Sequence, residues 1–413
     1  MRITVALTLL ASFPVASVQP APLPLVRRAP PGATQPIAPG YRALPPLPTL
    51  ALTPPIPEVQ RVEVLGNGFI EVANALALVP RAQASPAQAL TLAQLAVARA
   101  FAARPTLAEV DVSVYLRATY AGYGGPAPLL TASVPNMRRA QFAALRAKSV
   151  GTYDRAWQNP DLSPAPPNLA PTGETAPEAP EAPEITPTFE GSERQTLLQR
   201  LEQALSALRG PRPGTGVLFH GDPRRRVMAL TFDDAAHPLF EPLLLDALRR
   251  GGAKATFFIV GRNARAYPYF VRDMVAQGHE LANHTYHHVR LPGLSEAAVR
   301  DELQRTDDVL RAITGQDARY FRPPGGRYSS QVLGVAKSLG LTTAFWTDDP
   351  ADFNNPGAVI LENRLARHLR PGGIILLHDN ARQTIGLLTD FVNDARARGY
   401  TLTTLRDMMG APR

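Results

Sequence analysis

Short β-rich runs alternate with helical stretches along the second half of this 413-residue chain, and this alternation constrains the fold more than any other feature. Parallel strands need a long crossover, usually a helix, so the pattern predicts βαβ units that form a parallel sheet. About seven strands favour a (β/α) barrel that lacks one unit over an open doubly wound sheet. The runs are 227–232, 255–260, 280–283, 320–322, 343–346, 374–377 and 400–404.

Proline is concentrated in two stretches ahead of these strands, which together hold 22 of the 42 prolines. Such stretches stay extended because they cannot bury enough apolar surface to fold. We therefore interpret 19–57 as a Pro-rich spacer and 158–192 as an acidic, Pro-rich linker. The catalytic domain would then occupy 193–413 and begin with an amphipathic helix over 192–208.

A small α+β accessory domain is predicted over 58–157, between the two Pro-rich stretches. A Gly-Asn-Gly turn joins two β-rich runs as a hairpin, and apolar residues recur at helical spacing further on. The segment holds no histidine, so we expect no catalysis there, and a binding or localisation module and a structural spacer both stay open. The expected elements are a hairpin within 61–75, helices over 85–103 and 136–148, and strands over 110–120 and 128–134.

The first 18 residues are typical of an export signal. An apolar run follows Met1 and Arg2 and ends near the small-residue stretch Val15-Ala16-Ser17. The run is short for a membrane span and is interrupted by Pro14. We expect a cleaved signal peptide rather than an uncleaved anchor, no transmembrane helix in the mature chain, and a periplasmic, cell-wall-associated or secreted protein.

The composition restricts the chemistry that is open to the chain. Cysteine is absent, which excludes disulfides, thiolate metal sites and cysteine nucleophiles, so any metal must bind nitrogen and oxygen. All eight histidines lie in the second half. The net charge of +8 favours an anionic partner such as an acidic cell-wall polymer. Neither a long basic tract nor an RNA-binding motif is visible, so we expect no nucleic-acid binding.

Candidate reactive residues stand at the ends of the predicted strands. Asp233 and Asp234 leave the first strand in divergent directions, so one can bind a metal while the other accepts a proton. A helix N-cap is the structural alternative. His284 and His288 would share one face of a helical turn, and two histidines with one carboxylate suit a catalytic zinc site. His287 would point elsewhere and be structural.

Further strand ends carry polar residues as well. Arg322 begins a Pro-Pro-Gly-Gly loop, where it can orient a carboxylate while a backbone amide holds an oxyanion; a tight strand-to-helix turn is the alternative. His378 has the acidity to protonate a leaving amine if a carboxylate such as Asp352 holds its protonated form. His279 is expected to be structural, and His237 is a candidate for a substrate rim.

Taken in order, these segments resemble the five motifs of the polysaccharide deacetylase family of carbohydrate esterases, which has the NodB-homology fold. The resemblance spans roughly 227–409 and implies a deformed (β/α) barrel. The motifs are Thr231-Phe232-Asp233-Asp234, His284 to His288, Arg322-Pro323-Pro324-Gly325, Asp349-Pro350-Ala351-Asp352 and Leu376-Leu377-His378.

The resemblance also implies a cofactor. One divalent metal ion would be held by Asp234, His284 and His288. Zinc is the expected metal, although cobalt, manganese or iron suit the same ligands. Asp233 would act as the base toward metal-bound water, and Arg322 would position Asp233.

The remaining roles and departures follow from the same resemblance. The amide of Gly325 would help to stabilise the oxyanion, His378 would protonate the leaving amine, and Asp352 would tune His378. Ala235 stands where the family usually has glycine, which puts the geometry of that turn in question. Phe353 replaces a frequent tryptophan, and Gly325 itself replaces a frequent aromatic residue; both changes bear on substrate fit.

The function implied is removal of N-acetyl groups from an N-acetylhexosamine polysaccharide, with peptidoglycan as the favoured substrate and acetate as a product. An O-acetyl esterase of the xylan type uses the same chemistry and is one alternative. The other is a non-catalytic protein that binds cell-wall glycans, in which Ala235 has abolished turnover.

Overall fold

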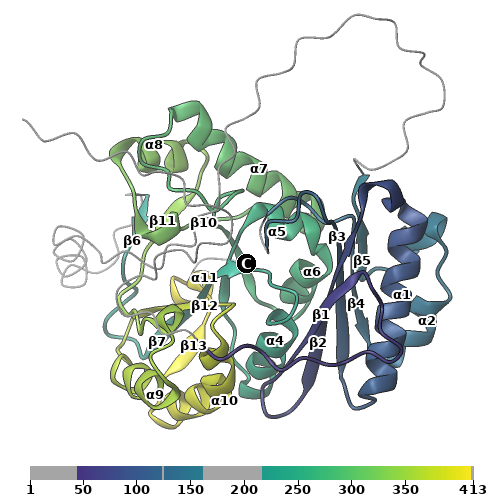
Figure 1. The fold of residues 1–413 in the computed structure, drawn as a ribbon. Coiled ribbons are helices and arrows are strands. Elements are labelled where there is room, and N and C mark those ends of the chain that lie inside the picture. Colours follow the sequence, from purple (N-terminus) through teal and green to yellow (C-terminus); the bar gives the residue numbers. More distant parts are fainter. Residues whose placement is uncertain (1–43, 123–124, 161–215, 411–413) are drawn as a thin grey trace, which may run out of the picture. The chain divides into compact units, whose positions relative to one another are not determined.

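The computed structural model describes residues 44–122, 125–160 and 216–410, and these belong to one compact unit, Ala38–Arg413 (Figure 1). The expected signal peptide, most of the Pro-rich spacer and linker, and the helix over 192–208 lie outside the described residues. Among the described helices, none has both the length and the hydropathy that a membrane span needs.

The second half of the chain folds into a parallel eight-stranded sheet that forms a deformed barrel. The order of strands is β12-β7-β8-β9-β10-β11-β6, and β13 pairs with β7. After β11 in the chain, Asp348 forms a parallel bridge with Ile375 of β12, the first strand in this order. This bridge brings the two ends of the sheet together. The strands are β6 (Val217–Leu218), β7 (Val227–Ala235), β8 (Thr256–Ile259), β9 (Glu280–Asn283), β10 (Tyr320–Phe321), β11 (Thr342–Ala344), β12 (Ile374–His378) and β13 (Thr401–Thr403).

All seven predicted strands are confirmed, and their connections are helical as expected. One strand, β6, was missed because a two-residue strand has no periodicity to detect. Strand β7 also runs further than predicted and includes the acidic pair. The connecting helices are α4 (Glu241–Gly251), α5 (Gly261–Ala266), α6 (Pro268–Ala276), α7 (Glu296–Thr314), α8 (Ser330–Ser338), α9 (Ala358–Arg367), α10 (Arg382–Ala397) and α11 (Leu405–Met408).

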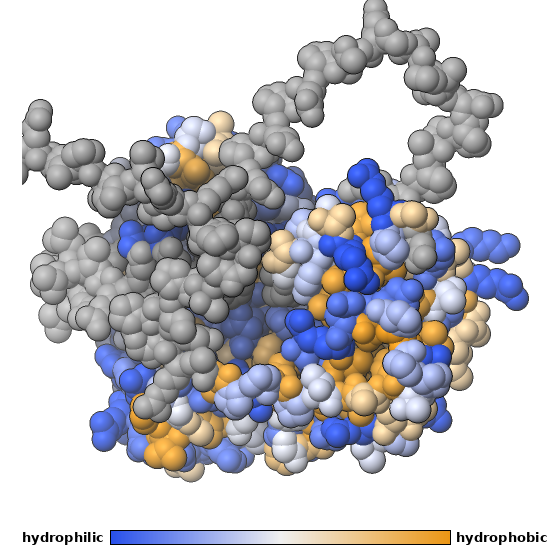
Figure 2. Space-filling view, viewed as in Figure 1, coloured by the Kyte–Doolittle hydropathy of each residue, from blue (hydrophilic) through white to orange (hydrophobic). Residues whose placement is uncertain are grey.

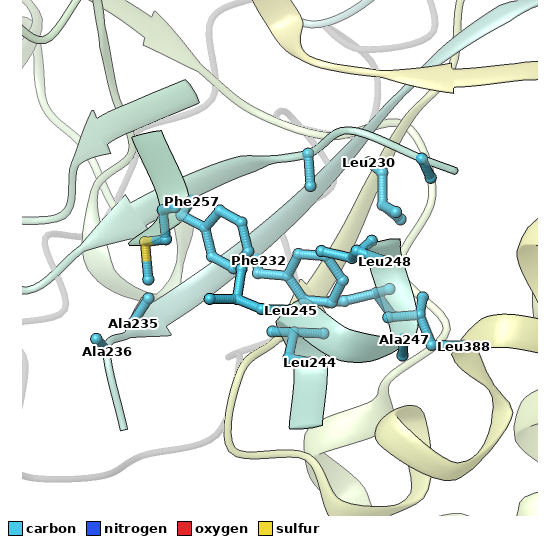
Figure 3. Packing of buried hydrophobic residues seen from close by; sticks show 14 of the residues in the cluster. Leu230, Phe232, Ala235, Ala236, Leu244, Leu245, Ala247, Leu248, Phe257 and Leu388 are labelled. Atoms are coloured by element: carbon cyan, nitrogen blue, oxygen red, sulfur yellow. The ribbon is translucent and has the colours of Figure 1, made fainter. Parts of the chain in front are cut away.

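The main core of the barrel lies between β7, β8 and the helix that follows β7. Phe232 and Phe257 stack with their ring centroids 5.4 Å apart. Figure 3 shows Leu244, Leu245 and Leu248 of α4 beside these rings. Because both faces of β7 are buried, its sequence is a nearly continuous apolar run up to the acidic pair.

Residues 59–158 form a second, five-stranded sheet in the order β1-β2-β3-β4-β5, and helix α1 packs on it through a shared apolar core (Figure 1). The hairpin is present as β1 and β2. The single helix expected over 136–148 is wrong, since the segment breaks into the short helices η2, α2 and η3. The elements are β1 (Val59–Gly66), β2 (Glu71–Val79), α1 (Pro86–Ala103), β3 (Glu109–Leu116), β4 (Leu130–Pro135), η2 (Asn136–Arg138), α2 (Arg139–Ala143), η3 (Ala147–Thr152) and β5 (Ala156–Gln158).

The five-stranded sheet contacts the barrel through its hairpin. The Asn67 side chain donates hydrogen bonds of 3.0 Å to the Leu243 carbonyl oxygen and to the Asp246 carboxylate. Beside it, Leu65 and Leu239 belong to one buried apolar cluster. Most apolar side chains of the described residues are buried in such cores. On the face in Figure 2, hydrophobic areas lie among hydrophilic side chains.

We predict that Phe232→Ala lowers the free energy of unfolding by about 3–5 kcal/mol, because it removes a fully buried ring and leaves a cavity. Phe69→Ala is the matched control. Its ring is 55% exposed and lies 4.4 Å from the Arg250 guanidinium as a cation–π partner, so its loss costs about 1 kcal/mol. Denaturant unfolding measures the free energy of unfolding of both variants. An equal decrease in the two variants would contradict the difference in burial between the two rings.

Candidate active site

The reactive residues gather at the C-terminal ends of neighbouring parallel strands. Asp233 and His378 are register partners on β7 and β12. His284 directly follows β9, and Arg322 directly follows β10. Parallel strands present their carboxyl ends at one edge, so residues far apart in the sequence meet there.

Asp234, His284 and His288 form a group that can hold a metal ion. One possible ligand atom from each lies within 4.8 Å of the others. The Asp234 carboxylate is 3.1 Å from His288 Nε2 and 3.6 Å from His284 Nε2. His284 Nδ1 lies 2.8 Å from the Arg322 carbonyl oxygen. A carbonyl only accepts, so Nδ1 carries the proton and Nε2 presents its lone pair.

This donor set fits the expected cofactor. Two imidazole nitrogens and one carboxylate oxygen are ligands that zinc and related divalent metals take, and three protein ligands leave coordination positions open. Burial opposes ionisation of Asp234, but His288 and His284 outweigh it and hold the pKa of Asp234 well below its ordinary value. The carboxylate is therefore charged, as a metal ligand must be.

The backbone that brings these ligands together is not the helical turn that the spacing predicted. Residues 284–288 form a loop with bends at Tyr286 and His287, and Thr285 and His288 have positive φ values of 66° and 58°. Asp234 has a φ of 73°. Positive φ is uncommon outside glycine, although Asp and His adopt it more often than most residues, and strained residues of this kind cluster at active sites. The two imidazoles meet, with ring centroids 5.0 Å apart, through local backbone strain rather than helical periodicity.

Arg322 and Asp233 form a buried ion pair beside the candidate metal ligands. The Arg322 guanidinium donates to the Asp233 carboxylate at 2.7 Å and to the Thr231 hydroxyl at 2.9 Å. Its other nitrogens donate to the carbonyl oxygens of Ala344 and Phe345, each at 3.1 Å. The side chain of Arg322 is fully buried, so these partners fix the orientation of Asp233.

His378 is paired with Asp352. Its Nδ1 lies 2.8 Å from one Asp352 oxygen, and its backbone N–H donates to the other at 2.9 Å. The Thr384 hydroxyl also donates to Asp352, at 2.8 Å. Burial lowers the pKa of His378, but Asp352, with smaller contributions from Asp234 and Asp233, outweighs burial and raises the pKa to about 10. His378 therefore carries a proton at neutral pH.

The departures from the family pattern have local explanations. The left-handed residue of the turn is Asp234, and Ala235 is not among the residues with positive φ, so its methyl group adds no backbone strain there. Gly325 has a φ of 63°, and the space beside its Cα is open. The Phe353 ring packs edge-on against His378, with centroids 5.4 Å apart.

Two other histidines have structural contacts. His279 Nδ1 accepts a hydrogen bond from the Ala255 amide, and burial lowers the pKa of His279 to about 4, which agrees with the expected structural role. His237 Nδ1 accepts from the Leu239 amide, and burial lowers the pKa of His237 to about 3, so the ring is neutral. Its place at a substrate rim stays a prediction.

Glu302 of α7 is a residue that the sequence reasoning missed. Its carboxylate accepts hydrogen bonds from the backbone N–H groups of Tyr286 and His287, at 3.0 and 2.9 Å, and lies 2.6 Å from His287 Nδ1. It thus holds the loop between His284 and His288, the two candidate histidine ligands. The signal was available: Glu302 stands in the buried stripe of an amphipathic helix, beside Val299 and Leu303. An acid at such a position needs specific partners.

Comparison with known proteins identifies the family. The family model for polysaccharide deacetylase matches residues 220–344. A peptidoglycan-N-acetylglucosamine deacetylase of Bacillus cereus is 31% identical, over 45% of this chain and 88% of that protein. A chitooligosaccharide deacetylase of Sinorhizobium fredii is 35% identical, over 47% and 94%. A peptidoglycan-N-acetylmuramic acid deacetylase of Bacillus subtilis is 32% identical, over 46% and 74%.

The fold and the site define a carbohydrate esterase, an enzyme that hydrolyses acetyl groups on sugars. The chain belongs to the polysaccharide deacetylase family. The resemblance first seen in the five motifs is thereby confirmed.

We predict that Glu302→Gln weakens zinc binding about tenfold or more, because residues that hold metal ligands in place typically contribute 10- to 100-fold to affinity. The neutral amide cannot accept from all three donors of the loop. Calorimetric titration of the metal-free protein measures the affinity. Glu296→Gln, on an exposed position of the same helix, is the control, and equal affinities for the two variants would contradict the role of Glu302.

We predict that Asp352→Asn lowers the pKa of His378 from about 10 toward or below the ordinary histidine value of about 6.5. Without the carboxylate, burial favours the neutral ring, so the proton is lost at lower pH. An NMR titration of the imidazole in metal-free protein, assigned by its loss in His378→Gln, gives the midpoint. Asp394→Asn, which changes an exposed surface ion pair, should leave the titration midpoint of His378 unchanged. An unchanged midpoint in Asp352→Asn would refute the pairing of His378 with Asp352.

Proposed function

We propose that this chain is a metal-dependent hydrolase that removes N-acetyl groups from an N-acetylhexosamine-containing polysaccharide, with peptidoglycan as its substrate. The observation that carries the proposal is that a three-residue metal-ligand group and two differently charged acid–base candidates meet at one edge of the barrel. Two of the relatives described above are peptidoglycan deacetylases, which supports the choice of substrate.

Asp234, His284 and His288 would hold the metal ion. When bound, a divalent cation supplies Lewis acidity, which polarises an acetyl carbonyl and makes water more acidic. We propose zinc as the ion, and cobalt, manganese or iron suit the same nitrogen and oxygen ligands.

The chain's own residues would then divide the proton transfers. Asp233 is oriented by Arg322 and accepts a proton from the attacking water. The amide of Gly325 donates to the oxygen that becomes negative in the tetrahedral state. His378, held protonated by Asp352, gives its proton to the nitrogen as it leaves. A bond from the water oxygen to the carbonyl carbon forms and the carbon–nitrogen bond breaks, leaving acetate and a free amino sugar.

The domain organisation belongs to the same proposal. Residues 193–413 would be the catalytic domain and 58–157 an accessory domain, joined by the acidic linker. With an export signal over 1–18, the enzyme would act outside the cytoplasm, where the cell-wall polymer is found. Export of a chain with a net charge of +8 also suits a polyanionic wall.

The test is acetate release from peptidoglycan, N-acetylglucosamine oligomers and acetylxylan, with metal-free protein reloaded with zinc, cobalt or manganese. We expect release from peptidoglycan. Release from acetylxylan alone would indicate an O-acetyl esterase. Binding to wall glycan with no release under any metal would indicate the non-catalytic protein.

We predict that two histidine variants fail in different ways. His284→Ala should lose both metal and activity, because a site with three protein ligands cannot spare one. His378→Ala should keep full metal content and lose about 10²- to 10⁴-fold in kcat, the usual contribution of a general acid. Elemental analysis and acetate release are measured on the same samples. Unchanged turnover in His284→Ala would be incompatible with the proposed metal site.

A further inference from the structure

A small cavity lies beside the candidate active site, between the five-stranded sheet and the barrel. Tyr115 of β3 and Trp157 of β5 line one side. Arg262 and Arg265 of α5, and Tyr267 directly after it, line the other. None of these residues belongs to the motifs of the deacetylase family.

The wall of the cavity is continuous with the metal-ligand loops. Asn263 lines the cavity, and its side-chain amide donates to the Asp234 carbonyl oxygen at 3.3 Å. The Arg262 backbone N–H donates to the carbonyl oxygen of Tyr286 at 3.1 Å. Tyr286 also lines the cavity and stands between the two histidine ligands in the sequence. Lining residues thus contact the backbone of both loops that carry the candidate metal ligands, and the cavity lies next to those loops.

The size of the cavity selects a side group rather than a whole sugar. Its volume is about 40 Å³, whereas one water molecule needs about 10–15 Å³ by the same kind of measure. The cavity thus has room for about three water-sized groups. A carboxylate consists of three heavy atoms and fits, but a pyranose ring does not.

The chemistry of the lining selects an anion. Among the described residues that line the cavity there are two arginines and no acidic side chain. The Tyr115 and Tyr267 hydroxyl oxygens are 3.0 Å apart and share a hydrogen bond, and burial raises the pKa of both, that of Tyr267 to about 12, so neither adds a negative charge to the cavity. Guanidinium groups bind carboxylates through paired, charge-assisted hydrogen bonds.

We propose that this cavity binds the carboxylate of the saccharide next to the one that is deacetylated. The ligand class is an amino sugar with a carboxylate side group, as in a muramoyl residue with its lactyl ether. The inference rests on the proposed function, because it assigns a second contact to the same polymer. It gives the segment that includes β3 and β5 a part in substrate selection.

The experiment compares two tetrasaccharides of equal length, one with alternating muramoyl residues and one of N-acetylglucosamine alone. In Arg262→Gln and in Arg265→Gln, we expect the KM for the muramoyl tetramer to rise about tenfold. The KM for the uncharged tetramer should change less than twofold. Arg81→Gln, an exposed arginine outside the lining, removes the same charge and should alter neither value. Equal effects on both tetramers, or no effect on either, would overturn the inference.

Equilibrium binding separates this inference from the proposed function. If the wild-type protein releases no acetate from either tetramer, the proposed function fails, but calorimetric titration with each tetramer still tests the cavity. Tighter binding of the muramoyl tetramer that is weakened about tenfold by Arg265→Gln, and not by Arg81→Gln, supports the site. Equal affinity of the wild type for both tetramers refutes it. Thermal unfolding checks that each variant is folded.

Discussion

The buried ion pair between Arg322 and Asp233 is the interaction on which the site depends. A buried cation without partners would be costly, so every donor direction of Arg322 needs an acceptor. The guanidinium meets Asp233 and Thr231 of β7 and two carbonyl oxygens at the end of β11. It also lies over the Phe258 ring, 4.0 Å from its centroid. One side chain thus joins the ends of three strands, and the carbonyl oxygen of the same residue orients His284.

Two histidines at this edge suit different roles because their Nδ1 partners differ. His284 Nδ1 faces the backbone carbonyl oxygen of Arg322, which fixes the Nδ1–H tautomer and turns Nε2 toward the candidate metal position. His378 faces the Asp352 carboxylate, which stabilises the charged ring. The same residue type can therefore be a ligand in one place and a proton donor in the other, and a single contact decides between the two.

The sequence predicted the residues that stand at strand ends, because a buried strand followed by acids, histidine or arginine is a local pattern. Residues that act across the fold were missed: Glu302 reaches the ligand loop from a helix, and nothing near His287 in the sequence shows that contact. The helical turn predicted for 284–288 was wrong for a related reason. Spacing alone does not distinguish a helix from a strained loop, and here Thr285 and His288 take positive φ values.

The loop after Asp234 links the strain at the site to the five-stranded sheet. A residue at positive φ costs about 1–3 kcal/mol and persists only where its surroundings hold it. Leu239 and Phe240 continue this loop and are buried in a cluster with Leu65 and Val72 of the hairpin. Each such buried side chain contributes about 1.5–3 kcal/mol, so two of them outweigh the strain at Asp234. The hairpin thus helps to hold the candidate metal ligand Asp234 in place, although it supplies no such residue itself.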